Sequence, residues 1–269
     1  MKFLFWNVNR RALDDLVVDL ASEHNVDLVM LAEYAGDPFV LLDLLNRDNG
    51  FGFYSVPTLS DTIRLFVRFS PDYARAVFDS PRITIHSFSL PARVDFILAV
   101  VHMPSKLFWS DDSQMLECTR LSNIIRRIEV EVGHDRTILV GDLNMNPFEK
   151  GIIGAAGLNA AMTRRTAAKG ARTVQAEAYP FFYNPMWNGF GDDNNEVCGT
   201  YYHDSGQHVN YYWNLFDQVL FRPALLEWLP ERPAKIVTQT STGSLLSEAG
   251  APSTTVGSDH LPLVFSVNV

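Results

Sequence analysis

The sequence predicts a single α/β domain in which mixed β-sheets are covered by helices. Short runs of buried, strand-like residues alternate along the 269 residues with segments whose apolar positions recur at helical spacing. The composition is 47% hydrophobic and 20% charged, which suits a chain that buries a large core. Because the sequence has no internal repeat, low-complexity tract or clear interdomain linker, we expect residues 1–269 to form one domain.

The first part of the chain predicts two strands and two helices. Residues 2–8 (KFLFWNV) are rich in aromatic and apolar side chains, which favours a strand, and residues 12–25 then repeat apolar positions at helical spacing. Residues 26–33 (VDLVMLAE) form a short apolar run, which predicts a second buried strand. Residues 38–50 again have helical spacing and close on Asn49-Gly50, a signal for the end of a helix.

The middle of the chain predicts three strands and one long helix. Residues 62–69, 83–90 and 94–103 are runs rich in β-branched and aromatic side chains, so each is predicted to be a strand. Residues 111–132 predict a helix with acidic residues in its first turn, where they interact favourably with the helix dipole.

The remaining elements are predicted from shorter signals. Residues 137–144 (TILVGDLN) predict a strand and residues 148–162 a short helix, and two late strands are predicted at 215–223 and 262–269. The long segments 189–211 and 239–258 are rich in Gly, Ser, Asn and Asp. Loops of this length inside a compact domain are often functional.

Cysteine content and apolar run length predict an intracellular, cytoplasmic protein. Cys118 and Cys198 are too few for a disulfide framework and form no CxxC zinc motif, so free thiols are expected. The apolar runs are far shorter than the roughly 20 residues that a membrane-spanning helix needs. The N-terminal apolar stretch is also too short for a signal peptide, and basic residues follow it.

The net charge of −9 argues against tight binding of a long duplex, because phosphate contacts with basic residues supply most of that affinity. Basic residues form local clusters only. They are Arg10–Arg11, Arg126–Arg127, and the group Arg164, Arg165, Lys169 and Arg172. The ordinary interpretation of each is a solvated helix face or loop. The third cluster lies in residues 163–172, which lack apolar periodicity and are predicted to form an exposed loop.

Polar side chains stand near the ends of six predicted strands. Asp142 and Asn144 are two residues apart, so in an extended chain their side chains would face the same side. A polar turn after the strand would explain that pair equally well. The other side chains of this kind are Asn7, Glu33, His102, Asp217, Asp259 and His260. Because binding sites of α/β sheets favour strand ends, the polar residues at these six strand ends together predict one site.

The residue types at these strand ends restrict the chemistry. Glu33 with nearby Asp and Asn oxygens suits Mg²⁺, which binds few protein carboxylates and keeps waters. The sequence has no HExxH or Cys/His cluster, no GxGxxG or GxxxxGK[ST] loop and no GxSxG elbow. The reaction that these residue types still allow is metal-assisted attack of water on a phosphate. This reaction requires a metal, a base that orients the water and donors for the developing charge.

Six motifs in fixed order carry a resemblance to a known family. WNVN, LAEY, VVHMPS, GDLNMNP, FDQVLFRP and GSDHLP extend over nearly the whole chain. Each motif alone is weak, but the ordered set resembles the endonuclease/exonuclease/phosphatase superfamily with the DNase I-like fold. The resemblance implies a four-layered αββα sandwich of two mixed sheets flanked by helices. It also implies a divalent-metal-dependent phosphoesterase that uses Mg²⁺, with Mn²⁺ as a substitute.

The resemblance also implies a metal and substrate site. Glu33 matches the metal-binding glutamate of the family, and Asn7 matches an asparagine near the metal and the phosphate. Asp259, in the Ser-Asp-His motif, is implied to contact the metal directly or through water. The motif departs from the pattern of many members, because Ala32 replaces an amide residue before Glu33 and Tyr34 follows it. Glu33 itself is intact.

The catalytic roles are likewise implied by the resemblance. Asp142 matches the aspartate that orients or deprotonates the attacking water, and Asn144 an asparagine that contacts phosphate or water. His102 matches a histidine that contacts the phosphate or serves as an acid. His260 matches the site histidine, and Asp217 the carboxylate that orients it. A carboxylate on one imidazole nitrogen fixes the tautomer and raises the basicity of the ring.

Aromatic residues are concentrated between the Asp142 and Asp217 motifs. They include residues 181–190 (FFYNPMWNGF), Tyr201-Tyr202 and residues 211–213. Packing of long loops is favoured for Trp213 and most of residues 181–187, and a stacking platform for bases is the functional alternative. His86, His134, His203 and His208 match no motif and are interpreted as surface or core residues.

The predicted activity is that of a nuclease that hydrolyses phosphodiester bonds of DNA or RNA by metal-assisted in-line attack of water. The acidic balance favours short, single-stranded or distorted nucleic acid. One alternative is a phosphatase or phosphodiesterase for a small phosphorylated molecule or lipid head group. Another, from a different class, is a binding module without catalytic activity.

Overall fold

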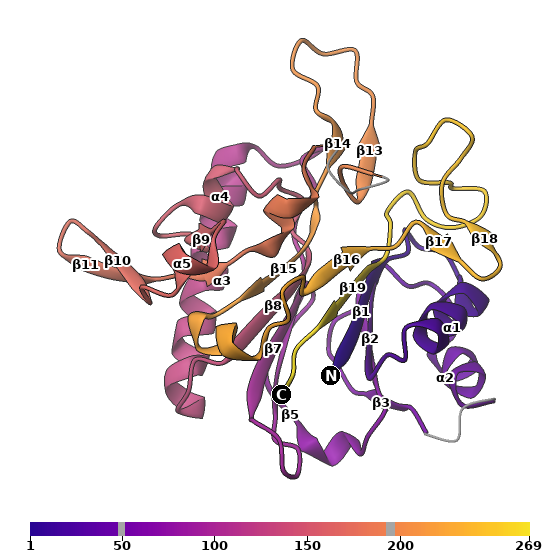
Figure 1. Ribbon diagram of the computed structural model, residues 1–269, viewed down its shortest axis with the longest axis horizontal. Helices are drawn as coiled ribbons and strands as arrows, with labels where there is room; N and C mark the ends of the chain where they lie inside the picture. Colours follow the sequence, from indigo (N-terminus) through magenta and orange to yellow (C-terminus); the bar gives the residue numbers. More distant parts are fainter. Residues whose placement is uncertain (48–51, 192–196) are drawn as a thin grey trace.

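The computed structural model describes residues 1–47, 52–191 and 197–269 (Figure 1). Two large mixed sheets pack face to face, and helices cover their outer faces. The four-layered αββα sandwich implied by the sequence motifs is therefore the observed fold.

Within the described residues, one sheet has six strands in the order β16-β19-β1-β2-β4-β3. Its strands are β1 (Lys2–Asn7), β2 (Leu28–Ala32), β3 (Tyr54–Val56), β4 (Ile63–Val67), β16 (Ala234–Ile236) and β19 (Leu263–Ser266). β1 and β2 run parallel, joined by helix α1 (Asp14–Glu23), and the other neighbours are antiparallel. Helix α2 (Pro38–Arg47) lies beside α1 (Figure 1). The helix end expected at Asn49-Gly50 falls outside the described residues.

The second sheet has seven strands in the described chain, in the order β5-β6-β7-β8-β15-β12-β9. They are β5 (Ala74–Ser80), β6 (Ile83–Phe88), β7 (Phe96–His102), β8 (Thr137–Asp142), β9 (Ala160–Ala161), β12 (Phe182–Tyr183) and β15 (Asp217–Phe221). Helix α3 (Asp111–Val132) joins the parallel strands β7 and β8. It coincides with the predicted helix, and its ends are set by the Ser110 side chain, which accepts from Ser113 N–H, and by left-handed Gly133.

Smaller elements decorate the two sheets. The hairpins are β10 (Ala171–Val174) with β11 (Glu177–Pro180), β13 (Tyr201–His203) with β14 (Tyr212–Asn214), and β17 (Gln239–Thr240) with β18 (Gly243–Ser244). The helical turns are α4 (Lys150–Ile153), α5 (Arg164–Ala167), η1 (Pro71–Tyr73), η2 (Pro185–Gly189) and η3 (Pro223–Trp228). Figure 1 shows β13 and β14 at the base of a long hairpin that projects beyond the sheets.

Side-chain alternation along the strands divides the core into layers. In β1, Phe3 and Phe5 face the layer between the sheets, while Leu4 and Trp6 face the opposite side and pack with α1 and α2. Phe3 stacks on Phe265, with 4.6 Å between ring centroids. The outer face of the seven-stranded sheet is covered by the buried stripe of α3, which comprises Cys118, Leu121, Ile125 and Ile128.

Two local predictions are wrong. Residues 148–162 form only the turn α4, because the chain folds back after Gly154, Leu158 N–H bonds Gly151 O, and β9 follows. The predicted loop 163–172 contains α5 and the start of β10, with Arg164 donating to the main-chain oxygens of Leu226 and Leu229. In the described part of the chain, no helix is long and apolar enough to cross a membrane. Cys118 and Cys198 are free thiols, as expected.

Candidate active site

The strand-end residues converge where the two sheets meet. In the seven-stranded sheet, Asp142 at the end of β8 lies between His102 of β7 and Asp217 of β15, each paired with it in register. From the other sheet, the Asn7 side chain donates from Nδ2 to Asp142 Oδ2 at 2.9 Å. The site therefore spans both sheets, and Asp142 lies at its centre.

His260 is held by two carboxylates. Its Nδ1 lies 2.7 Å from Asp217 Oδ2, and its Nε2 lies 4.0 Å from Asp142 Oδ2. Asp217 is fully buried, and the other two residues are nearly so. The predicted pairing of His260 with Asp217 is thus present, and the free nitrogen of the ring faces Asp142.

Burial and charge set the protonation of this group. Burial by itself would lower the pKa of His260, but the charge of Asp217 and its hydrogen bond, together with Asp142 and Asp259, raise the pKa to about 10. Burial raises the pKa of Asp142, against the opposing effect of His260. His260 is therefore protonated at neutral pH, and the Asp142 carboxylate is more basic than an exposed one.

Glu33 lies at the more open side of the site. Its Oε1 is 3.2 Å from His102 Nε2, and its Oε2 is 3.3 Å from Nε of Arg10. The hydrogen bond with His102, opposed by burial, lowers the pKa of Glu33 to about 2, so the carboxylate stays charged. His102 Nε2 also lies 3.9 Å from Asp142 Oδ2 and so links Glu33 to the centre.

Two backbone features aim these carboxylates. Glu33 has φ +52°, a left-handed conformation that costs a non-glycine residue about 1–3 kcal/mol and is typical of functional sites. Its N–H donates to Thr62 O and its carbonyl accepts from Arg10 N–H, both at 2.7 Å. Gly141 precedes Asp142 because a Cβ there would lie 1.9 Å from Val101 O.

Asn144 and Asp259 are placed differently from the rest of the set. Asn144 N–H donates to Asp142 Oδ1 at 2.8 Å, and its Nδ2 donates to Met103 O at 2.9 Å, so it ties the loops after β7 and β8 together. Asp259 Oδ1 lies 3.2 Å from Ser258 Oγ, and the charge of Asp259 raises the pKa of His260. Contact of either residue with phosphate or metal stays a prediction.

The sequence motifs did not indicate several residues that support the site. Ser258 Oγ donates to Asn7 O and accepts from His260 N–H, and Trp6 Nε1 donates to His260 O at 2.8 Å. Thr200 Oγ1 accepts from Asp217 N–H at 3.1 Å. The ring of Tyr201 lies against His260 with 4.8 Å between centroids. Ser258 and Trp6 lie inside the quoted motifs, and Tyr201 belongs to the aromatic residues noted in the sequence, which were usable signals. Thr200 had none.

The donor set fits a hard divalent cation. Glu33, Asp142, Asp217 and Asp259 offer carboxylate oxygens, which Mg²⁺ and Mn²⁺ prefer. In the described residues, ligand atoms of Asp142, Asp217 and His260 lie within 4.8 Å of one another. That group is buried and His260 Nδ1 is already bonded to Asp217, whereas Mg²⁺ keeps waters. Glu33, at the more open side, is the better candidate ligand.

A comparison with known protein families finds a match that includes the residues of this site. The sequence profile of the Endonuclease/Exonuclease/phosphatase family matches residues 4–260, from β1 to His260. The chain belongs to this family. The resemblance carried by the six motifs is thereby confirmed. Members of the family are phosphoric ester hydrolases that typically use a divalent metal. A search among curated protein sequences gives no match.

Solved structures share the fold at low sequence identity. D. rerio TDP2 complexed with single-strand DNA product is 15% identical, with TM-score 0.57, and the alignment covers 100% of this chain and 99% of that one. The human Nocturnin catalytic domain with bound sulfate is 15% identical, with TM-score 0.55 and coverage of 98% and 93%. The endonuclease domain of TRAS1, a telomere-specific non-LTR retrotransposon, is 13% identical, with TM-score 0.53 and coverage of 100% and 98%. At this identity, the likeness shows the family's DNase I-like fold alone.

Proposed function

We propose that this family member is a Mg²⁺-dependent phosphodiesterase that acts as a nuclease on short or single-stranded nucleic acid. The observation that carries the proposal is the placement of Asp142 between Asn7 Nδ2 and His260 Nε2, close to the Glu33–His102 pair. This arrangement puts a buried acceptor, a charged donor and a metal-binding carboxylate around one point. Those are the groups that hydrolysis of a phosphate ester requires.

Each residue of the site has a separate role in the proposed reaction. Asp142, oriented by Asn7, accepts the proton of the attacking water. His260, kept protonated by Asp217, donates to a phosphate oxygen and stabilises its negative charge. A divalent cation bound at Glu33, with Asn7 and Asp259 as further candidate ligands, would supply further stabilisation of that charge. His102 holds the Glu33 carboxylate and stands close enough to Asp142 to contact the same phosphate.

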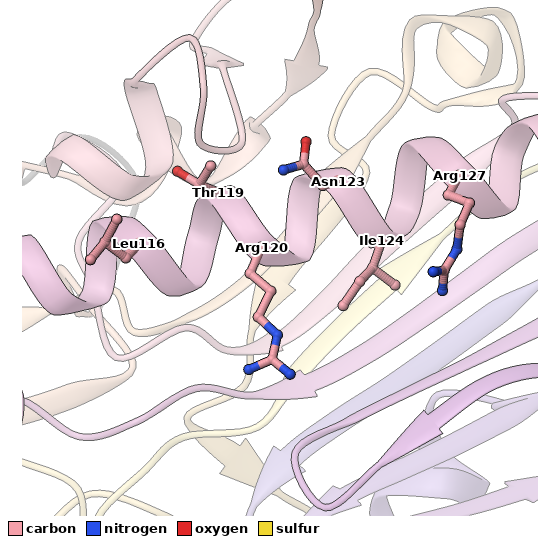
Figure 2. Close-up of a pocket in the computed structure, with 6 residues that line it drawn as sticks. All are labelled: Leu116, Thr119, Arg120, Asn123, Ile124 and Arg127. Carbon is pink, nitrogen blue, oxygen red and sulfur yellow. The ribbon is translucent and has the colours of Figure 1, made fainter.

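The preference for single-stranded nucleic acid rests on charge. In the Arg10–Arg11 cluster, Arg10 lies beside Glu33, and 85% of the Arg10 side chain is exposed. Arg126 and Arg127 lie on α3, and Arg164 and Arg172 bond main-chain oxygens. Figure 2 shows a hollow on the outward side of α3, where Arg120, Ile124 and Arg127 point the same way; it shares no residue with the site. TDP2 with its single-strand DNA product has the same fold.

A substrate panel tests the proposal. Single-stranded and duplex DNA, RNA and a phosphomonoester are incubated with Mg²⁺, with Mn²⁺ or with EDTA, and initial rates are measured. We expect the single strands to be cleaved fastest and EDTA to abolish turnover. Full turnover in chelator would refute the metal requirement, and hydrolysis of the phosphomonoester alone would refute the nuclease.

His260→Ala provides the control for catalysis in that panel. Loss of a positioned acid/base group lowers turnover by about 10²–10⁴-fold. Because Asp217 is fully buried, the alanine variant also leaves a carboxylate without its partner and loses stability. His260→Asn, whose amide can take the place of Nδ1 and donate to Asp217, separates the two effects. A folded His260→Asn protein with near wild-type turnover would show that His260 is not catalytic.

A further inference from the structure

Three aromatic rings form a row that leads from the core to the surface next to the site. Phe216 is buried, Tyr201 is half-buried and His203 is exposed. The ring centroids of Tyr201 and Phe216 are 5.4 Å apart with 21° between the planes, and those of Tyr201 and His203 are 6.3 Å apart with 19°. The rings of His203 and Phe216 are therefore each nearly parallel to that of Tyr201.

The row is fixed relative to the catalytic site. The Tyr201 ring lies against the His260 ring at 4.8 Å and 41°, and the two residues also form a β-bridge. Leu261 N–H donates to Thr200 O at 2.8 Å, which joins the strand of Tyr201 to the segment of His260. Burial raises the pKa of the Tyr201 phenol, and the charges of Asp259 and Asp142 raise it further. A group that packs on this row would therefore lie beside His260.

We propose that His203, Tyr201 and Phe216 form a stacking platform for one unpaired nucleobase beside the scissile phosphate. The inference rests on the proposed function and gives the nucleic-acid substrate its point of attachment. Stacking accepts any base, because every base presents a π-face. A base in a duplex is already stacked and paired, so the platform favours single strands. Stacking also supplies affinity that a chain of net charge −9 cannot draw from phosphate contacts alone.

The neighbouring tyrosine provides a matched control. Tyr202 follows Tyr201 in β13, so its side chain points to the opposite face of the hairpin. There it packs edge-on against Trp213, with 5.4 Å between centroids, and lies near Tyr212. Tyr202→Leu removes the same kind of ring from the same strand without touching the row.

The test uses single-stranded oligonucleotides in which one phosphodiester is cleavable and the other linkages are methylphosphonates. Each of two analogues lacks one base. In the first analogue the missing base is on one side of that phosphodiester, and in the second it is on the other side. We measure kcat/KM with Mg²⁺ and expect wild-type protein to prefer the complete substrate over one analogue by about fivefold to 150-fold, the range for one base–aromatic stack. Tyr201→Leu should bring this ratio close to one, His203→Ala should reduce it, and Tyr201→Trp and Tyr202→Leu should keep it.

Each remaining outcome overturns the platform. If Tyr201→Leu slows both substrates and leaves the ratio unchanged, Tyr201 only supports His260. If wild-type protein cleaves all three substrates equally, no base is bound. If Tyr201→Leu fails to fold, His203→Ala decides, because its side chain is exposed; an unchanged ratio then refutes the platform. Mg²⁺-dependent hydrolysis of a phosphomonoester with no oligonucleotide cleaved refutes the proposed nuclease function as well, so the two failures are distinguishable.

Discussion

Asp217 controls the charge of His260 from a position that water does not reach. Asp217 is fully buried, and its Oδ2 is 2.7 Å from His260 Nδ1. An isolated buried imidazole would be neutral at neutral pH, because burial penalises the charged form. The paired carboxylate reverses that preference, so His260 is charged at neutral pH. The same pair links protein stability to pH.

The Asp217→Asn variant tests this link in the presence of EDTA. The folded-state pKa of His260 is about 10 against an ordinary 6.5. Its protonation therefore stabilises the fold fully below pH 6.5, and this contribution is lost as the pH rises toward 10. Without the Asp217 charge, burial dominates and this loss should shrink. Urea unfolding at pH 6.5 and pH 10 measures it, with exposed Asp15→Asn as control; equal losses in wild type and Asp217→Asn would contradict the assignment.

At the scale of elements, a buried ion pair joins helix α3 to the seven-stranded sheet. Arg222, just after β15, donates from Nε to Glu129 Oε1 of α3 at 2.8 Å, and the side chains are 1% and 9% exposed. Thr137 Oγ1 of β8 donates to the same oxygen at 2.7 Å. The Arg222 guanidinium also packs over the Phe182 ring at 3.9 Å. This cluster of contacts therefore connects helix α3 with strands β8, β12 and β15 of the sheet.

Glu129→Ala should destabilise the protein by about 3–5 kcal/mol, because it leaves the Arg222 guanidinium buried without its counter-charge. The control is Glu131→Ala on the same helix, which breaks an exposed pair with Arg127 at 3.6 Å and should change stability by less than about 0.5 kcal/mol. The free energy of unfolding from urea titration measures both. Similar values for the two variants would show that the buried pair does not hold α3 in place.

At the scale of the whole molecule, the site depends on the contact between the sheets. Asn7 and Glu33 belong to the six-stranded sheet and its loops, while His102, Asp142 and Asp217 belong to the seven-stranded sheet. The bonds Asn7–Asp142 and Glu33–His102 cross from one sheet to the other. A cation bound at Glu33 would join these layers only in the folded protein, so its binding should stabilise the fold.

Mg²⁺ should raise the Tm of the wild-type protein, and Glu33→Gln should remove most of the increase. At a Mg²⁺ concentration one hundred times its Kd, the expected stabilisation is about 2.7 kcal/mol. Thermal unfolding with increasing Mg²⁺ measures it without any substrate. Glu117→Gln, on α3 and away from the site, serves as control. An equal Mg²⁺ shift in Glu33→Gln and wild type would place the cation elsewhere.

Local sequence determined the layers of this protein and the set of residues at its site. Apolar periodicity predicted α3 and the central strands, because a period of 3.6 or 2 follows directly from backbone geometry. The ordered motifs indicated the family and the residues at the strand ends. Edge strands such as β3 and β5 were not predicted, because most of their side chains are exposed or only half-buried and lack an apolar pattern.

Only the tertiary structure decided which of these residues touch and what charge they carry. Asn7 and Asp142 are 135 positions apart, and Asp217 and His260 are 43 apart, so their contacts depend on sheet register and on the packing of one sheet against the other. The same packing buries His260, which by itself would lower its pKa, and brings Asp217, Asp142 and Asp259 close enough for their charges to raise it. Tyr201 belongs to no motif, and its place beside His260 follows from a β-bridge between two loops. Residue types are local properties, whereas distance and dielectric environment arise from the fold as a whole.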